Sequence, residues 1–212
     1  ITTLFSVVIG YLIAYAMVHL VGRERNWMLT LVLISFWVSV LVRAFSWLTL
    51  LGRNGLVNAA LVGSGLVEEP ISMIRNEFGV LIGMVHYMVP YAVLPLFANM
   101  QGIDHRVMDA SRSLGAGPLL TFLRIYLPLT KPGVIAASLL VFIISLGFYV
   151  TPALLGGGRV LMVAEYVSVQ ILVTVQWGVA AMLATLLLSG VLALLYIMSR
   201  FMNIGEVFGS RG

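Results

Sequence analysis

Long apolar runs are the feature that most constrains what this chain can fold into. Five runs carry at most one charged residue each and are about as long as a membrane span: residues 1–21, 27–48, 78–98, 132–153 and 177–198. About 20 helical residues cross a hydrocarbon core roughly 30 Å thick. No run alternates polar and apolar residues with the period of two that a barrel strand needs. We therefore expect an all-α, polytopic transmembrane helix bundle with five spans.

The composition agrees with this class. Hydrophobic residues make up 61% of the chain and charged residues only 9%, whereas roughly a quarter of the residues of a soluble domain are charged. There is no cysteine, so this chain has neither a disulfide nor a cysteine-based metal or redox site. The basic pI of about 9.7 is explained by arginines in loops at one membrane face, and we expect no nucleic-acid partner.

Basic residues are distributed unequally between the two membrane faces. By the positive-inside rule, the face that is richer in Lys and Arg is cytoplasmic. The segment 99–131 is then a cytoplasmic loop, and the segments 49–77 and 154–176 lie outside. The richer face carries Arg23, Arg25, Arg106, Arg112, Arg124, Lys131, Arg200 and Arg211, and the other carries Arg53, Arg75 and Arg159.

The first part of the cytoplasmic loop has the pattern of a short capped helix. Asp104 is placed to cap "HRVMDASRSL" at its N-terminus. Val107, Ala110 and Leu114 would share one face of this helix. Gly115 suits the left-handed residue with which many helices end. We expect a short rigid helix followed by a glycine hinge.

The second part of the loop has the pattern of a membrane-surface segment. Pro118 can occupy the first turn of the amphipathic stretch "LLTFLRIYL". Pro128 and Pro132 are expected to close this stretch before the next span begins.

The order of residues in this loop resembles a known family. It is similar to the "Glu-Ala-Ala" loop of permease subunits in type I binding-protein-dependent ABC importers, although Asp109 and Ser111 stand where that family usually has Glu and Ala. The flanking stretches "SFWVSVLVRAFSWLTLLGRNGLVN", "GVLIGMVHYMVPYAVLPLFANM" and "FIISLGFYVTPALLGG" resemble its spermidine/putrescine branch. The loop residues that carry the resemblance are Asp109, Ala110, Ser111, Arg112, Gly115, Phe122, Ile125, Leu127, Pro128, Pro132 and Gly133.

The resemblance implies one ABC importer transmembrane domain over residues 1–212, in a bacterial cytoplasmic (inner) membrane. Such subunits usually have six spans, so we expect one more span before Ile1. The loop 99–131 would dock on an ATPase subunit that binds ATP and Mg. This chain has no phosphate-binding Gly-Lys-Thr motif and we expect no catalytic residue in it, so ATP hydrolysis is expected in that separate subunit. A second permease subunit, an extracytoplasmic substrate-binding protein and membrane lipid would be the other partners. The expected ATPase-coupling residues are Asp109, Ala110, Ser111, Arg112, Leu114, Gly115, Phe122 and Pro128.

Two other functional classes fit the sequence alone. A membrane scaffold could use the cytoplasmic loop to recruit a partner without any transport. An ion-coupled secondary transporter is the third interpretation, although no internal repeat of the kind that many such transporters show is present. Uptake that depends on nucleotide and on a partner ATPase separates the first interpretation from both.

Aromatic residues in the outer half of the spans are candidates for the substrate pathway. The resemblance implies a small solute such as a polyamine, with a modified amino acid as the alternative, and aromatic faces attract amine cations. Glu77 and Glu165 are the nearest acids, whereas Arg43 would repel a cation if it faced the path. The candidates are Phe45, Trp47, His86, Phe148, Tyr149 and Tyr166.

The sequence allows two interpretations for each of three further features. Arg43 either snorkels toward the outer headgroups or faces the pathway. His86 either bonds to a neighbouring helix or relays protons. The stretch 161–176 is either an interfacial helix or a re-entrant segment.

Overall fold

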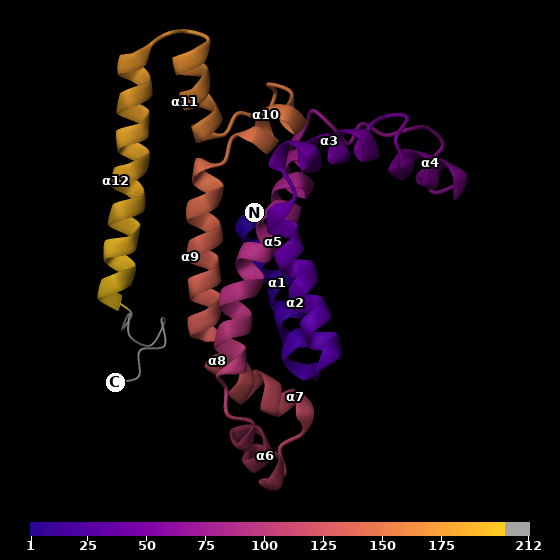
Figure 1. Ribbon diagram of the computed structural model, residues 1–212, viewed down its shortest axis with the longest axis vertical. Coiled ribbons are helices and arrows are strands. Elements are labelled where there is room, and N and C mark those ends of the chain that lie inside the picture. Colours follow the sequence, from indigo (N-terminus) through magenta and orange to yellow (C-terminus); the bar gives the residue numbers. More distant parts are fainter. Residues whose placement is uncertain (202–212) are drawn as a thin grey trace.

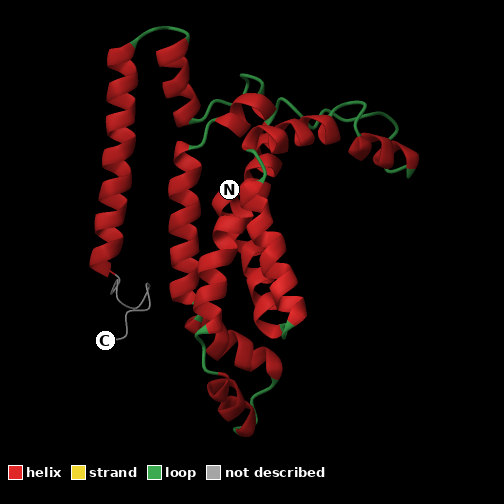
Figure 2. Ribbon diagram, in the orientation of Figure 1, coloured by secondary structure: helices red, strands yellow, loops and turns green. Residues whose placement is uncertain are grey.

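The computed structural model describes residues 1–201, and within this range every regular element is a helix. The predicted all-α, polytopic class is thus confirmed, while Arg211 lies outside the described residues. Helices account for most of this part of the chain (Figure 2). The elements are α1 Thr2–His19, α2 Arg23–Trp37, α3 Val40–Leu51, α4 Leu56–Gly63, α5 Glu77–Gln101, α6 His105–Ser113, α7 Pro118–Thr121, the π-helical turn η1 Phe122–Tyr126, α8 Leu127–Leu129, α9 Lys131–Gly147, α10 Val150–Gly156, α11 Val163–Leu172 and α12 Trp177–Phe201.

The core of the bundle forms around α5, which packs against α1 on one side and α9 on the other. Methionines fill much of it, because their unbranched side chains adapt to irregular gaps between helices. Gly10 lets α1 approach α5 closely, since a Cβ at this position would lie only 2.7 Å from the Cβ of Ala92. The largest fully buried apolar side chains include Met17, Met84, Met88, Leu96, Met100 and Leu155.

Three of the five predicted spans are single helices. α1, α5 and α12 are each long and apolar enough to cross a membrane, and their bounds lie within a few residues of the predicted runs. The other two crossings are bent: α2 is joined to α3 and α4 across an angle of 97°, and residues 118–129 are joined to α9 across 57°. Five spans are therefore present only if each bent pair counts as one crossing.

The predicted span over residues 27–48 is wrong in its second half. α2 ends at Trp37, Val38 and Ser39 are extended, and α3 then leaves nearly at a right angle. The stretch across the break, "FWVSV", contains neither proline nor glycine. Hydropathy does not detect this break, because apolar residues continue on both sides of it.

The predicted span over residues 132–153 ends too late. α9 stops at Gly147, and Phe148 adopts an extended conformation before α10 begins at Val150. The outer segment 161–176 does form a helix, α11, followed by the turn into α12.

The two ends of the bundle carry different structures (Figure 1). α6 and α7 lie together at one end, which we call the cytoplasmic end, and α3, α4, α10 and α11 lie at the opposite, outer end. This is the alternation of sides that the basic residues predict. α12 packs mainly on α11, and only 6% of its most apolar window is buried within the described chain.

The orientation can be tested with single cysteines, because the chain has no cysteine of its own. Ser113 at the cytoplasmic end and Ser64 at the outer end are both exposed. We expect Ser64→Cys to react with a membrane-impermeant maleimide from outside, and Ser113→Cys only after the inner face has been opened. The opposite labelling pattern would reverse the orientation of the whole bundle.

Candidate functional site

The short helix α6 is held by a cap at each end. The Asp104 carboxylate accepts a hydrogen bond from the Arg106 amide at 2.9 Å, which satisfies a free donor at the helix N-terminus. At the other end, the Gly115 amide donates to the Arg112 carbonyl at 2.9 Å. Gly115 has a φ of +86°, a conformation that side chains disfavour. Both predicted caps are confirmed, so this loop begins with a defined helix and a defined turn.

α6 is attached to the rest of the protein but leaves two large apolar side chains exposed. The Ser111 hydroxyl lies 3.0 Å from that of Thr121 on α7, and Met108 is buried. Val107 of α6 and Leu114, which directly follows the helix, nevertheless remain 43% and 89% exposed. These exposed apolar side chains lie at the cytoplasmic end, where a partner could contact them.

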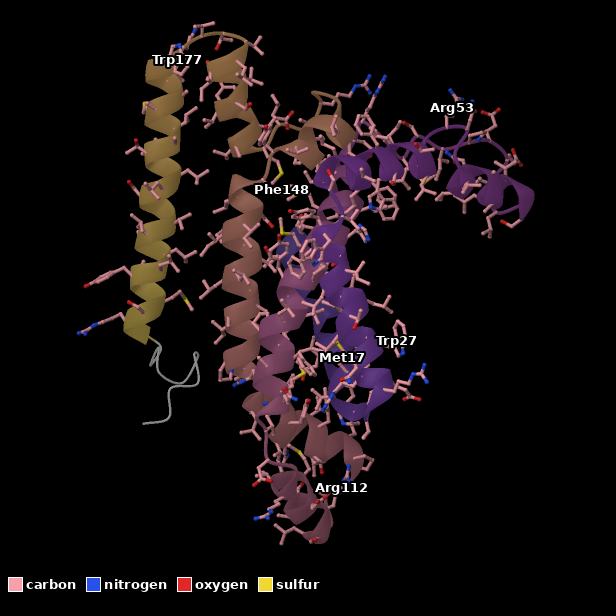
Figure 3. All side chains as sticks on the ribbon, in the orientation of Figure 1. Met17, Trp27, Arg53, Arg112, Phe148 and Trp177 are labelled. Carbon is pink, nitrogen blue, oxygen red and sulfur yellow. The ribbon has the colours of Figure 1, made fainter. Side chains whose placement is uncertain are left out.

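Two charged residues of α6 form a local pair. Arg112 and Asp109 lie three positions apart, with Nη1 and Oδ1 separated by 3.8 Å. Both side chains are largely exposed, so this pair adds little to stability. Figure 3 shows Arg112 at the cytoplasmic end, away from the spans. The pair is available for contacts with a partner.

The segment after the hinge is one continuous helical piece with a wide turn. Pro128 was expected to close it, and this is wrong: α8 includes Pro128 and continues to Leu129. The Leu127 amide donates to the Phe122 carbonyl five residues back, as in a π-helix. Such a turn helps to accommodate Pro128, because proline clashes with the carbonyl four residues before it in an ordinary α-helix.

Aromatic rings connect this segment to the first span. The rings of Phe122 and Tyr126 are nearly parallel, and Tyr15 of α1 meets both edge-on, with centroids 5.7 and 5.4 Å away. A movement of the cytoplasmic loop would therefore be transmitted to α1 through packed rings. Phe122 thus joins the loop to the bundle by packing, and its role in coupling to an ATPase stays a prediction.

At the outer end, Arg43 secures the break between α2 and α3. Its guanidinium donates hydrogen bonds to the carbonyls of Ser35 and Val38, which are left without helical partners at the end of α2. It also lies 4.9 Å from the ring centroid of Tyr87 on α5. Arg43 is only 8% exposed, so the interpretation that it snorkels to the headgroups is wrong.

The rings around Arg43 form a cluster that includes only part of the predicted pathway. Tyr87 packs on Phe148 and on Tyr91, and Tyr91 meets Phe36 edge-on. The sequence analysis missed Phe36, Tyr87 and Tyr91. Tyr87 and Tyr91 lie four residues apart on one helix and so share a face, and this spacing could have indicated that the two rings lie together.

A second contact connects α3 to α5. The Trp47 indole nitrogen donates to His86 Nδ1 at 3.2 Å, and the two rings meet edge-on. The interpretation of His86 as a partner of a neighbouring helix is confirmed. Phe45, Tyr149 and Tyr166, which were also predicted for the pathway, are exposed and make no ring contact with this group among the described residues.

Trp47 and His86 both border two cavities beside α5. The larger cavity has a volume of about 750 Å³ and lies between α1, α2, α3 and α5. The smaller one, of about 320 Å³, is also lined by Arg43. A small organic solute fits either volume. The lining of the larger cavity is almost wholly apolar: Phe5, Ile9, Ile13, Met28, Leu31, Val32, Ser35, Trp47, Phe78, Leu81, Ile82, Val85, His86, Val89 and Pro90.

The two candidate acids do not line these cavities. Glu77 is exposed in the first turn of α5. Glu165 on α11 is buried, and its Oε2 has no hydrogen-bond partner among the described residues. Burial raises the pKa of the Glu165 carboxyl. Within the described chain, the residues around the cavities therefore offer aromatic faces and a guanidinium but no carboxylate.

Comparison with known proteins finds a matching family and similar permease subunits. The family "Binding-protein-dependent transport system inner membrane component" matches residues 6–203. The spermidine/putrescine transport system permease protein PotB of Haemophilus influenzae is 34% identical over 92% of this chain and 69% of its own length. PotB of Escherichia coli K12 is 33% identical over 92% of this chain and 72% of its own length.

A solved structure has a similar fold. It is a bacterial alginate ABC transporter in complex with a periplasmic protein bound to an alginate pentasaccharide, and one of its chains superposes with a TM-score of 0.68. The match covers 92% of this chain and 71% of that chain, at 16% sequence identity. It supports the arrangement of helices and says nothing about the solute.

We predict that Arg43→Met destabilises the outer end of the bundle. The change leaves carbonyls at the end of α2 unpaired and removes the contact with Tyr87, which we expect to cost about 1–3 kcal/mol. Thermal unfolding of the purified protein should show a clearly lower melting temperature. Arg53→Met is the matched control, because Arg53 is exposed on the outer arm. Equal melting temperatures for the two variants would contradict the role of Arg43 as a clamp.

Proposed function

This chain belongs to the family of inner membrane components of binding-protein-dependent transport systems, and from this premise we propose that it forms part of a pathway for a polyamine such as putrescine or spermidine. It is a multi-pass permease subunit of an ABC importer in the inner membrane, and a transport protein rather than an enzyme. In our proposal, a separate ATPase subunit binds ATP and Mg, a second permease subunit completes the path, and an extracytoplasmic protein delivers the solute.

The observation that carries the proposal is the exposure of two apolar side chains at α6. Val107 and the capping residue Leu114 are 43% and 89% exposed, and Ser111 connects the helix to α7. A helix that is capped at both ends moves as a rigid body, so a push on these side chains reaches α7 and then α1. Nucleotide-driven movement of a docked ATPase would reach the spans by this route.

The polyamine assignment rests on the similarity to PotB and on the aromatic residues near the cavities. Trp47 borders both cavities, and ring faces attract amine cations by about 0.5–2 kcal/mol each. The carboxylates that an amine also needs would come from the second permease subunit or from the binding protein.

A second candidate solute has its own support. Arg43 is a buried cation at the smaller cavity, and no described carboxylate pairs with it. A guanidinium in this position favours a solute that carries a carboxylate, such as a modified amino acid. The two candidates differ in charge and are therefore easily separated.

We predict that Leu114→Glu uncouples the transporter. A carboxylate on the docking face would be buried without a partner, and we expect solute-stimulated ATP hydrolysis and uptake to fall tenfold or more, which corresponds to about 1.4 kcal/mol. Ser113→Glu adds the same charge at the neighbouring exposed position and should have a much smaller effect. Unchanged stimulation in Leu114→Glu would refute docking through this face, and a scaffold would show no nucleotide-dependent uptake at all.

Competition between solutes for uptake by the reconstituted complex tests which solute is transported. We expect uptake of labelled putrescine to require ATP and to be inhibited by unlabelled spermidine, with little inhibition by neutral or anionic solutes. Transport of an anionic amino-acid derivative that no polyamine inhibits would rule out the cationic solute and support the second candidate.

A further inference from the structure

The helix α3 lies across the outer end of the bundle. α2 and the segment formed by α3 and α4 meet at 97°, and α3 and α4 extend sideways from the spans (Figure 1). Because the spans cross the membrane, a helix at a right angle to them lies close to the membrane plane. Figure 3 places Arg53, which follows α3, on the side of this arm that faces away from the spans.

One face of α3 is attached to the bundle, and the opposite face is apolar and open. Arg43, Ala44 and Leu51 are buried, and α3 contacts α10 and α5. Leu41, Val42 and Phe45 are 51%, 59% and 56% exposed. The open face forms a shallow groove of about 650 Å³, which also includes Ser46, Thr49 and Leu50.

The two hydroxyl groups in this groove are already hydrogen-bonded within the helix. Ser46 donates to the Val42 carbonyl at 2.8 Å, and Thr49 donates to the Phe45 carbonyl at 3.0 Å. Both hydroxyl groups of the groove therefore have a hydrogen-bond acceptor within the helix. A surface in contact with lipid must fulfil this condition, because lipid chains accept no hydrogen bonds. A surface that contacts water or binds a polar partner has no such requirement.

The end of α2, next to α3, also exposes apolar side chains. Near the corner, Ile34 and Trp37 of α2 and the following Val38 are 52%, 90% and 40% exposed. Trp37 stands at the corner, where the span ends, and tryptophan is enriched at this depth of the membrane. Exposed apolar side chains are therefore found on both sides of the corner between α2 and α3.

We propose that the face of α3 formed by Leu41, Val42 and Phe45 is inserted into the outer leaflet, at the boundary between headgroups and acyl chains. A helix of this kind is buried by about 5–10 Å. The lipid would hold one face of α3 while Arg43 on the other face holds it to α5, so α3 is an interfacial anchor for the outer end of the transporter. This role does not depend on which solute is moved.

Site-directed spin labelling tests the proposal in the complete transporter, reconstituted in vesicles of phosphatidylethanolamine and phosphatidylglycerol. Single nitroxides replace Leu41, Val42 and Phe45 one at a time, with Leu186 on the exposed side of α12 as the lipid control and Arg53 as the aqueous control. We expect collisions with oxygen to exceed those with a water-soluble nickel chelate at positions 41, 42 and 45, as at 186. At position 53 we expect collisions with the nickel chelate to exceed those with oxygen.

Two outcomes would overturn the proposal. High collision rates with the nickel chelate at 41, 42 and 45 would place this face in water or against a wetted binding protein. Low rates with both reagents would place it against a second permease subunit. Unlabelled cysteine variants provide a check without the nitroxide: a membrane-impermeant maleimide should react slowly at 41, 42 and 45 and quickly at 53, and equal rates would refute insertion.

Discussion

Hydrogen bonding of the backbone within the membrane is the constraint on which this structure depends. A helix that crosses lipid satisfies its own amides and carbonyls, but a break leaves some of them without partners. At the corner of α2 and α3, Arg43 supplies the donors. At the bend before α9, the buried Thr130 hydroxyl donates to the Leu127 carbonyl at 2.9 Å and lies 3.1 Å from the Tyr11 hydroxyl. Each bend is thus held by a polar side chain that also fixes its neighbours.

The sequence predicts the features that depend on local signals, but it does not predict the break between α2 and α3. The loop helix follows from local signals: Asp104 caps it and Gly115 ends it, and both act within a few residues. Long apolar helices such as α5 also follow from composition alone. The break after Trp37 does not, because Arg43, which bonds to the carbonyls at the break, follows it in the sequence and reaches them only in the folded structure.

The aromatic cluster shows the same limit at the candidate pathway. Trp47, His86 and Phe148 were expected there, and the structure brings the first two together and places the third on Tyr87. Tyr87 and Tyr91 were missed, because a tyrosine within a span is as compatible with packing as with a pathway. Only the position of Arg43 over Tyr87 distinguishes their surroundings from ordinary core.

The separate position of α12 has a consequence for how the protein is made. Among the described residues, every buried member of the main hydrophobic core lies at or before Leu155, whereas α12 packs mainly on α11. The residues of this core are therefore all synthesised before α12 leaves the ribosome, so they can pack together first. α12 then joins as a late addition through the hairpin with α11, with its remaining surface free for lipid or another subunit.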